Sequence, residues 1–180
     1  MSQAMAQLFQ RITTGVHVIG VADAIRPSAF TAAWVMPVSF QPLLMALSGN
    51  PDHASNVLLK AGGHFTVNVL GKSQLALAAH FGTPGRMDKL AGHAWHPGRS
   101  GAPLLDDALA LFECSVTAEL PAGDHVLTLG RVLWGELRDT SMEPLIYRDT
   151  GNLDGAAARQ AVNALEYSLL SRADHTLCIK

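Results

Sequence analysis

Apolar and polar residues alternate along several short segments of the chain, with the two-residue period of a half-buried β-strand. The clearest of these segments are residues 15–23, 64–71, 108–120 and 125–137. The last two are joined by the short sequence PAGD, which is typical of a tight turn between antiparallel strands. Residues 42–48 and 144–148 add shorter apolar runs, so the pattern predicts at least six strands.

Apolar residues recur at helical spacing in other segments. These segments are residues 4–12, 50–62, 73–82 and 155–172. The second has clear boundary signals, with Asn50 as a candidate N-cap, Pro51 at the first helical position and Gly62 at the stop. Residues 82–103 are rich in Gly and Pro and predict an irregular connection with a short helix near residues 87–90.

Strands that follow one another mostly as hairpins, with helices between some of them, favour an antiparallel barrel with peripheral helices over alternating βαβ units. The predicted fold class is therefore mainly β with peripheral helices, of the α+β kind. A length of 180 residues is enough for one buried core and requires no second one.

Residues 29–40, AFTAAWVMPVSF, have the hydropathy of a strand but an unusual composition. Small residues and Pro37 stand where Val, Ile and Leu would fill a core, which indicates a backbone that another molecule approaches closely. A plain core strand is the alternative reading of this segment.

Charge and composition limit the partners and the location. The formal net charge is -2 and no Lys or Arg cluster occurs, so nothing in the sequence attracts nucleic acid. No uncharged apolar segment reaches the roughly 20 residues that span a bilayer, and the N-terminus lacks the pattern of a signal peptide. Two widely separated cysteines fit a reducing compartment. We therefore expect a cytoplasmic protein that binds neither nucleic acid nor membranes.

Several common catalytic motifs are absent from the sequence. There is no G-x-G-x-x-G after a strand, no phosphate-binding P-loop and no G-x-S-x-G. His93 and His96 lie three residues apart without a carboxylate at ligand spacing, so we expect no metal site. If the protein is an enzyme, a bound organic cofactor supplies the difficult chemistry.

Four sequences occur in order along the chain: TTGVHVIGV, AFTAAWVMPVSFQPLLMALS, HFTVNVLGKSQLALAAHFG, and GAPLLDDALALFECSV followed by AGDHVLTLGRV. In content and spacing, from about residue 8 to about residue 155, they resemble the flavin reductase-like family. These are FMN-binding split-barrel proteins that include the NAD(P)H:flavin oxidoreductase components of two-component monooxygenases. The resemblance implies an FMN-binding split β-barrel over residues 1–155 and a C-terminal helical extension over residues 156–180, packed on the barrel or on a dimer partner.

The resemblance also implies which residues contact the flavin. Three groups match family positions at the isoalloxazine ring, namely Phe30, Thr31, Ala32, Ala33, Trp34, Val38 and Ser39 in the first group, Asn68, Val69 and Leu70 in the second, and Phe81 alone. Small side chains at residues 31–33 would let a backbone N–H approach the polar edge of the ring, where negative charge develops on reduction. Core packing is the alternative for Phe81.

The sequence SGNPDHASN matches the family's phosphate loop. It offers hydrogen-bonding side chains at a strand-to-helix junction, where free N–H groups favour an anion; these are Ser48, Asn50, His53, Ser55 and Asn56. Asp52 departs from the family pattern because a carboxylate repels a phosphate. The alternative is that these residues only cap the helix.

His125 is the catalytic candidate, because the family's Gly-Asp-His turn places its histidine near the flavin and the nicotinamide. Asp124 is expected to shape the turn. Leu153 stands where many members carry an aromatic residue, a departure at the end of the barrel where the nicotinamide would enter.

Taken together, the resemblance implies a homodimer that transfers hydride from NADH or NADPH to FMN. FAD is the other flavin that the family resemblance allows. The reduced flavin would be supplied to a monooxygenase partner. An apolar share of 48% fits a surface that another subunit covers. Two alternatives stay open: a tightly bound FMN used for electron transfer or direct substrate oxidation, and a non-enzymatic flavin or haem binder.

Overall fold

A computed structural model describes residues 8–9, 11–85 and 88–151 of the chain. Thr14–Tyr147 form one compact unit, which carries the whole sheet. The helix predicted over residues 155–172 and the extension at 156–180 lie outside the described residues. Of the helix predicted over residues 4–12, residues 8, 9, 11 and 12 are described, and residues 8 and 9 are helical.

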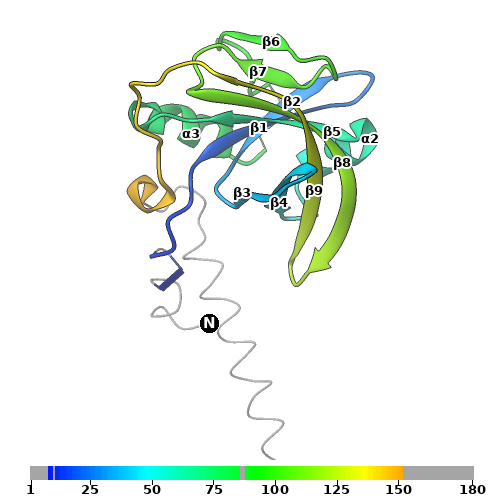
Figure 1. The fold of residues 1–180 in the computed structure, drawn as a ribbon. Coiled ribbons are helices and arrows are strands. Elements are labelled where there is room, and N and C mark those ends of the chain that lie inside the picture. The colour runs from blue at the N-terminus through cyan, green and yellow to red at the C-terminus, as the bar shows by residue number, and fades with distance from the viewer. Residues whose placement is uncertain (1–7, 10, 86–87, 152–180) are drawn as a thin grey trace, which may run out of the picture. The chain divides into compact units, whose positions relative to one another are not determined.

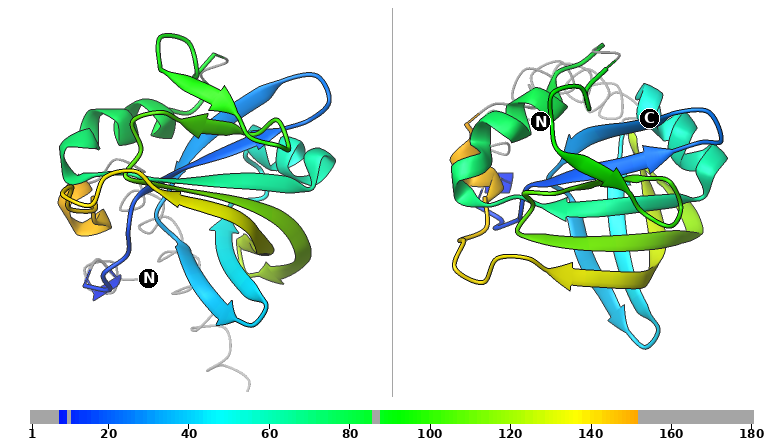
Figure 2. Two further views of the ribbon diagram at one scale, coloured as in Figure 1. Left: turned by 45° about the horizontal axis from the view of Figure 1, so that its top comes forward. Right: turned by 90° about the horizontal axis from the view of Figure 1, so that it is seen from above.

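Seven antiparallel strands form one strongly curved sheet, in the order β2-β1-β5-β8-β9-β4-β3. Their bounds are β1 His17–Ala22, β2 Pro27–Ala32, β3 Val35–Phe40, β4 Leu43–Gly49, β5 His64–Val69, β8 Ala110–Ala122 and β9 His125–Leu137. The register of the long β8–β9 hairpin shifts twice, and such irregularities bend and twist a strand pair. Figures 1 and 2 show the result, in which β4 and β3 curl beneath β1 and β5 as an open barrel. The predicted antiparallel barrel is confirmed.

Short helices and a second hairpin surround this sheet. They are α2 Ala54–Gly62, the 3-10 turn η1 Lys72–Gln74, α3 Leu75–Gly82, and the two-stranded β6 Trp95–Pro97 and β7 Pro103–Leu105. The 3-10 turn η2 Tyr147–Thr150 follows later in the sequence. Because side chains alternate along a strand, β1 contributes to two apolar clusters. Val18 packs with Phe81 of α3 and with Leu105 of β7, whereas Ile19 packs with Phe65 and with Leu58 of α2.

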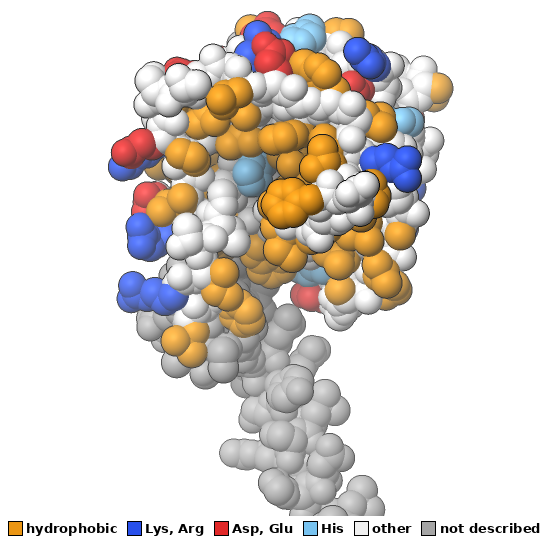
Figure 3. All heavy atoms as spheres, in the orientation of Figure 1, with side chains coloured by type: hydrophobic (Ala, Val, Ile, Leu, Met, Phe, Trp, Pro, Cys, Tyr) orange, Lys and Arg blue, Asp and Glu red, His pale blue; other side chains and the backbone are white. Residues whose placement is uncertain are grey.

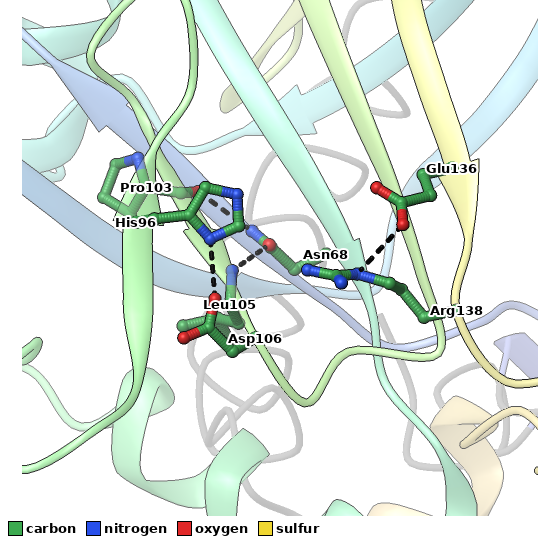
Figure 4. Close-up of polar contacts among 7 residues, drawn as sticks. All are labelled: Asn68, His96, Pro103, Leu105, Asp106, Glu136 and Arg138. Atoms are coloured by element: carbon green, nitrogen blue, oxygen red, sulfur yellow. Dashed lines mark hydrogen bonds and ion pairs between the residues drawn. The ribbon is translucent and has the colours of Figure 1, made fainter.

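A buried polar network joins β5 to β7. The amide of Asn68 donates to the carbonyl oxygen of Val18 at 2.9 Å, and its Oδ1 accepts from the backbone N–H of Leu105 at 2.7 Å. The amide also reaches the carbonyl oxygen of Pro103 at 3.3 Å, which Thr66 contacts as well. Figure 4 shows Asn68 between Pro103 and Leu105. These contacts satisfy a fully buried amide, as burial of a polar group requires.

The structure corrects the predicted boundaries of two elements. Residues 29–40 are two strands, not one, because the chain leaves the β1 ladder after Ala32 and joins β4 from Val35. The helix predicted from Asn50 begins at Ala54, because the side chain of Asn50 accepts the N–H of Asp52 and closes a turn before the helix.

Two further predicted elements are wrong. Residues 144–148 make only isolated bridges, at Pro144 and Ile146, and Tyr147 already begins the η2 turn, so no strand forms. Residues 88–90 of the predicted short helix are not helical, and residues 86–87 are not described.

Candidate functional site

Three segments that are far apart in the sequence meet at one corner of the barrel. β4 pairs with β3 on one side and with β9 on the other, so the end of β4 lies beside the beginnings of both strands. The loop into α2 follows directly. The pocket formed there, which we call the corner pocket, is lined by Phe30, Leu47, Gly49, Asn50, His53, Asn56, Leu59, Val126 and Thr128.

The indole of Trp34 lies against the imidazole of His125 at the edge of this corner. The ring centroids are 4.9 Å apart and the planes are tilted by 44°. The backbone of Trp34 is held by the N–H of Ser48, which donates to its carbonyl oxygen at 2.9 Å. Two residues that the sequence analysis placed at the flavin therefore touch each other, although 91 positions separate them (125 − 34).

Asp124 hydrogen-bonds its neighbour His125, with Nδ1 of the imidazole 2.8 Å from Oδ1 of the carboxylate. The hydrogen bond from His125 holds the pKa of the Asp124 carboxyl below its ordinary value, against a smaller opposing effect of burial. A carboxylate accepts, so Nδ1 donates, and Nε2 is the ring nitrogen left to meet a substrate. Asp124 therefore orients the catalytic candidate in addition to shaping the turn.

The predicted phosphate loop forms the polar side of the corner pocket. Asn50, His53 and Asn56 line it, and the first turn of α2 contains no acidic residue, which favours an anion at the helix N-terminus. One of these donors is already occupied within the loop: the amide of Asn56 donates to the carbonyl oxygen of Pro51 at 3.1 Å. Ser48 and Ser55 lie beside the pocket without lining it, and Asp52 is exposed.

The corner pocket is small. Its free volume of about 20 Å³ has room for one water or one oxygen of an anion, not for a ring system. The polar side of the pocket therefore suits the phosphate end of a flavin nucleotide. A planar ring fits only outside the pocket.

A second and larger hollow, the hairpin groove, lies between the β3–β4 hairpin and the rest of the sheet. Its free volume is about 350 Å³, the size of a ligand pocket. It is lined by His17, Val35, Met36, Pro37, Ser39, Phe40, Leu43, Leu44, Met45, Val67, Val69, Phe112 and Val132. Figure 3 shows hydrophobic side chains gathered on the face that carries β3 and β4.

His17 is one of two polar residues in the lining of the hairpin groove. Burial lowers the pKa of its imidazole to about 4, so the ring is neutral at pH 7. In the part of the chain that the structure describes, Nδ1 of His17 has no hydrogen-bond partner.

The predicted flavin-contact segment is divided between these places. Phe30 lines the corner pocket and Ser39 the hairpin groove. The hydroxyl of Thr31 points elsewhere, since it donates to the carbonyl oxygen of Ala78 in α3 at 2.7 Å. Ala32 still pairs with β1, while Ala33 lies in the break between β2 and β3, outside both ladders. Val38 is exposed at a register shift of β3, an edge strand with free backbone groups.

Three predicted contact residues have structural roles in the described fold, and their contact with a flavin stays a prediction. Asn68, Leu70 and Phe81 are fully buried. The backbone of β5 is paired with β1 and with β8, so its amides cannot turn toward a ligand. Phe81 packs in the cluster that joins α3 to the sheet. Val69 keeps a half-buried side chain in the hairpin groove.

Several lining residues were missed by the sequence analysis. Val126 and Thr128 of β9 line the corner pocket, and their position two residues apart, directly after His125, was the available signal. His17 lies within the alternating segment 15–23, and nothing in that pattern distinguishes it from a surface residue.

Among the described residues, no three or more His, Cys, Asp and Glu side chains are grouped to hold a metal ion. Burial raises the pKa of the Cys114 thiol to about 12, which leaves it protonated and unreactive. No helix in the described part of the chain is long and apolar enough to cross a membrane.

Comparison with known proteins agrees with this architecture. Residues 9–155 match the family of the flavin reductase like domain. The chain belongs to this family. It is 32% identical over 163 residues to a probable flavin reductase of Rhizobium meliloti, an alignment that covers 90% of this chain and 51% of the relative. Across the curated relatives it matches, the chain spans from about a quarter to just over half of their length.

Solved structures of other flavin reductase family proteins share its fold. The NADH:FAD oxidoreductase of Streptomyces globisporus C-1027 is 30% identical with a TM-score of 0.74, covering 81% of this chain and 88% of that one. The flavin reductase component of a bacterial two-component tryptophan halogenase is 32% identical with a TM-score of 0.75, covering 83% and 95%.

Proposed function

We propose that this protein is an NAD(P)H:flavin oxidoreductase that binds FMN at the corner pocket. The observation that carries the proposal is the convergence of Trp34, the loop after β4 and His125 at one corner of the barrel. The family and its relatives, a probable flavin reductase and an NADH:FAD oxidoreductase among them, support the same activity. FMN is preferred over FAD in this proposal because a small polar pocket at a helix N-terminus suits a terminal phosphate.

The roles of the residues follow from where they lie. FMN, when bound, supplies the acceptor for hydride from NADH or NADPH. His53, Asn50 and the N-terminal amides of α2 hold the phosphate, and the backbone at Ala33, outside the strand ladders, is available to the polar edge of the ring. The Nε2 atom of His125 orients the incoming nicotinamide by a hydrogen bond, because Nδ1 is already held by Asp124.

The same proposal includes a homodimer built on the β3–β4 hairpin. This hairpin exposes large apolar side chains that a monomer in water would not favour, with Phe40 89% exposed and Met36, Val38 and Leu43 also exposed. Sedimentation should show a dimer for the wild type, and Phe40→Ser should shift it toward monomer without unfolding it. A wild-type monomer at micromolar concentration would remove this part of the proposal.

The partner proposed for this chain is a flavin-dependent oxygenase or halogenase in the cytoplasm, which takes up reduced flavin by diffusion. One structural relative is the reductase component of a two-component tryptophan halogenase. No described surface of this chain is assigned to such a partner, since diffusible flavin requires no lasting contact.

Steady-state oxidation of NADH and NADPH, with and without added FMN, FAD or riboflavin, tests the proposed function. We expect oxidation to accelerate with free flavin and FMN to bind more tightly than riboflavin. A flavin-coloured protein that oxidises neither NADH nor NADPH would favour the alternative of a tightly bound flavin that receives electrons from another donor.

His125→Ala tests the site within that assay. We expect anaerobic flavin reduction to slow by roughly tenfold or more, because an oriented hydrogen bond is lost, while the flavin dissociation constant changes less. His96→Ala is the matched control, since His96 also hydrogen-bonds a carboxylate, that of Asp106 at 2.6 Å, but lies on β6. Equal rates for the two variants would remove His125 from its role.

A further inference from the structure

Trp34 has a large side chain but contributes little to the apolar core. It lies in the short break between β2 and β3, and its indole is 47% exposed although its backbone is held by Ser48. Among the described residues it is not part of either apolar cluster. An aromatic residue that is half exposed and has a fixed backbone is suited to hold something else in place.

The side chain that Trp34 contacts is held at two points. The indole contacts the His125 imidazole in a tilted arrangement at a centroid distance of 4.9 Å, and Asp124 accepts the hydrogen of Nδ1 at 2.8 Å. The Asp124 contact restrains rotation of the ring about its Cβ–Cγ bond through one weak, exposed hydrogen bond. The indole adds a second restraint, because the ring cannot turn toward the side that the indole occupies.

A second histidine of the same chain shows what the indole adds. His96 makes the same kind of bond, with Nδ1 2.6 Å from Oδ1 of Asp106, and Figure 4 shows this pair on the β6–β7 hairpin. In the described chain no aromatic ring packs on His96, and its side chain is 46% exposed, against 24% for His125. The carboxylate is common to both pairs, whereas among the described residues the contact with an indole is found at His125 and not at His96.

We propose that Trp34 is a positioning residue for the reaction, which holds the His125 imidazole so that Nε2 is presented to the incoming substrate. This rests on the proposed function for the role of His125, but the clamp itself is a property of the ligand-free protein. Its effect falls on the rate of flavin reduction, because a misoriented hydrogen-bonding group loses the geometry that lowers the barrier. The indole acts through His125, so removing Trp34 should matter only while His125 is present.

The functional test is a double-mutant cycle with Trp34→Ala and His125→Ala, measured as the rate of anaerobic flavin reduction at saturating flavin. We expect Trp34→Ala to slow reduction roughly tenfold and Trp34→Phe, which keeps an aromatic ring, to restore most of the rate. In the His125→Ala background, Trp34→Ala should have no further effect on the rate. Trp95→Phe, on β6, is the control for loss of an indole in general.

Two outcomes of the cycle would overturn the proposal. One is a tenfold loss from Trp34→Ala that persists when His125 is already absent. The other is an increased flavin dissociation constant with an unchanged rate of reduction at saturating flavin, which would make the indole a direct flavin contact. Thermal unfolding of each variant shows whether it is folded, and Trp34→Phe remains informative if Trp34→Ala is not.

A ligand-free measurement separates this proposal from the proposed function. The ring current of the indole should shift the imidazole proton resonances of His125 in the wild-type protein, and Trp34→Ala should abolish that shift while leaving the His96 resonances in place. Unshifted His125 resonances would overturn the clamp. A wild-type protein that shows the shift but reduces no flavin would overturn the proposed function and leave the clamp intact.

Discussion

The corner that holds His125 and the hairpin β6–β7 that holds His96 contain the same local arrangement, a histidine bonded to a nearby aspartate. Their surroundings differ. The polar groups beneath β6–β7 are buried and saturated, with Asn68 and Glu113 each making several hydrogen bonds. The corner has an exposed indole and a pocket with polar side chains on one side instead. Saturated polar groups stabilise a fold, whereas a function needs groups that still have capacity to bind.

Asn68→Ala should produce the largest loss of stability in this comparison. It leaves the N–H of Leu105 buried without its side-chain partner and removes the side-chain hydrogen bond to the carbonyl oxygen of Val18, which we expect to lower the free energy of unfolding by about 3 kcal/mol. Urea denaturation measures this loss of stability. Asn50→Ala, which loses one exposed turn hydrogen bond in the corner, should cost less than about 1 kcal/mol.

The same variant also tests the separation of the two regions. Flavin reduction per folded molecule of Asn68→Ala should stay within about twofold of wild type, because the network touches no residue of the corner pocket. A large loss of rate in fully folded protein would show that β5 contributes to the site, as the sequence resemblance implied.

Asn68 also shows which features of the fold and the site could be predicted from the sequence. The period-two alternation predicted the strands because that signal is local. The Gly-Asp-His turn and the loop after residue 48 were singled out by the family resemblance, and the structure brings them to one corner. Whether Asn68 or Phe81 faces a ligand depends on which strands and helices pack on β5 and α3, and those partners are distant in the sequence. The break at Ala33–Trp34 was missed for the same reason, since only pairing with β4 makes the chain change ladders.

Glu113→Gln should have a smaller and pH-dependent effect on the β6–β7 side. Burial alone would raise the pKa of the Glu113 carboxyl, but hydrogen bonds from Ser100 and Arg99 outweigh it and leave that pKa below its ordinary value. A lowered pKa in the folded state stabilises the protein above the ordinary pKa, and this stabilisation is lost as the pH falls through the folded value.

We therefore expect Glu113→Gln to lower the free energy of unfolding by about 2 kcal/mol at pH 7, and by less as the pH falls below the ordinary range of a glutamate. Denaturation at pH 7 and near pH 4 measures both values. Glu136→Gln is the matched control: its bond to Arg138, at 3.5 Å, is partly exposed and worth about 0.5 kcal/mol or less. A constant difference at every pH would contradict the lowered pKa.

The smallest expected effects compare the two aspartates directly. Asp124→Asn and Asp106→Asn each remove one carboxylate from an exposed pair with histidine, so both should change the free energy of unfolding by less than about 0.5 kcal/mol. The two variants should differ in the rate of flavin reduction. An asparagine at position 124 can offer Nδ1 of His125 either its amide nitrogen or its oxygen, so it orients the ring less strictly than a carboxylate. We expect Asp124→Asn to slow anaerobic flavin reduction about threefold and Asp106→Asn to leave it unchanged. If both variants reduced flavin at the wild-type rate, the indole of Trp34 alone would be sufficient to hold His125, and the carboxylate would belong to the turn only.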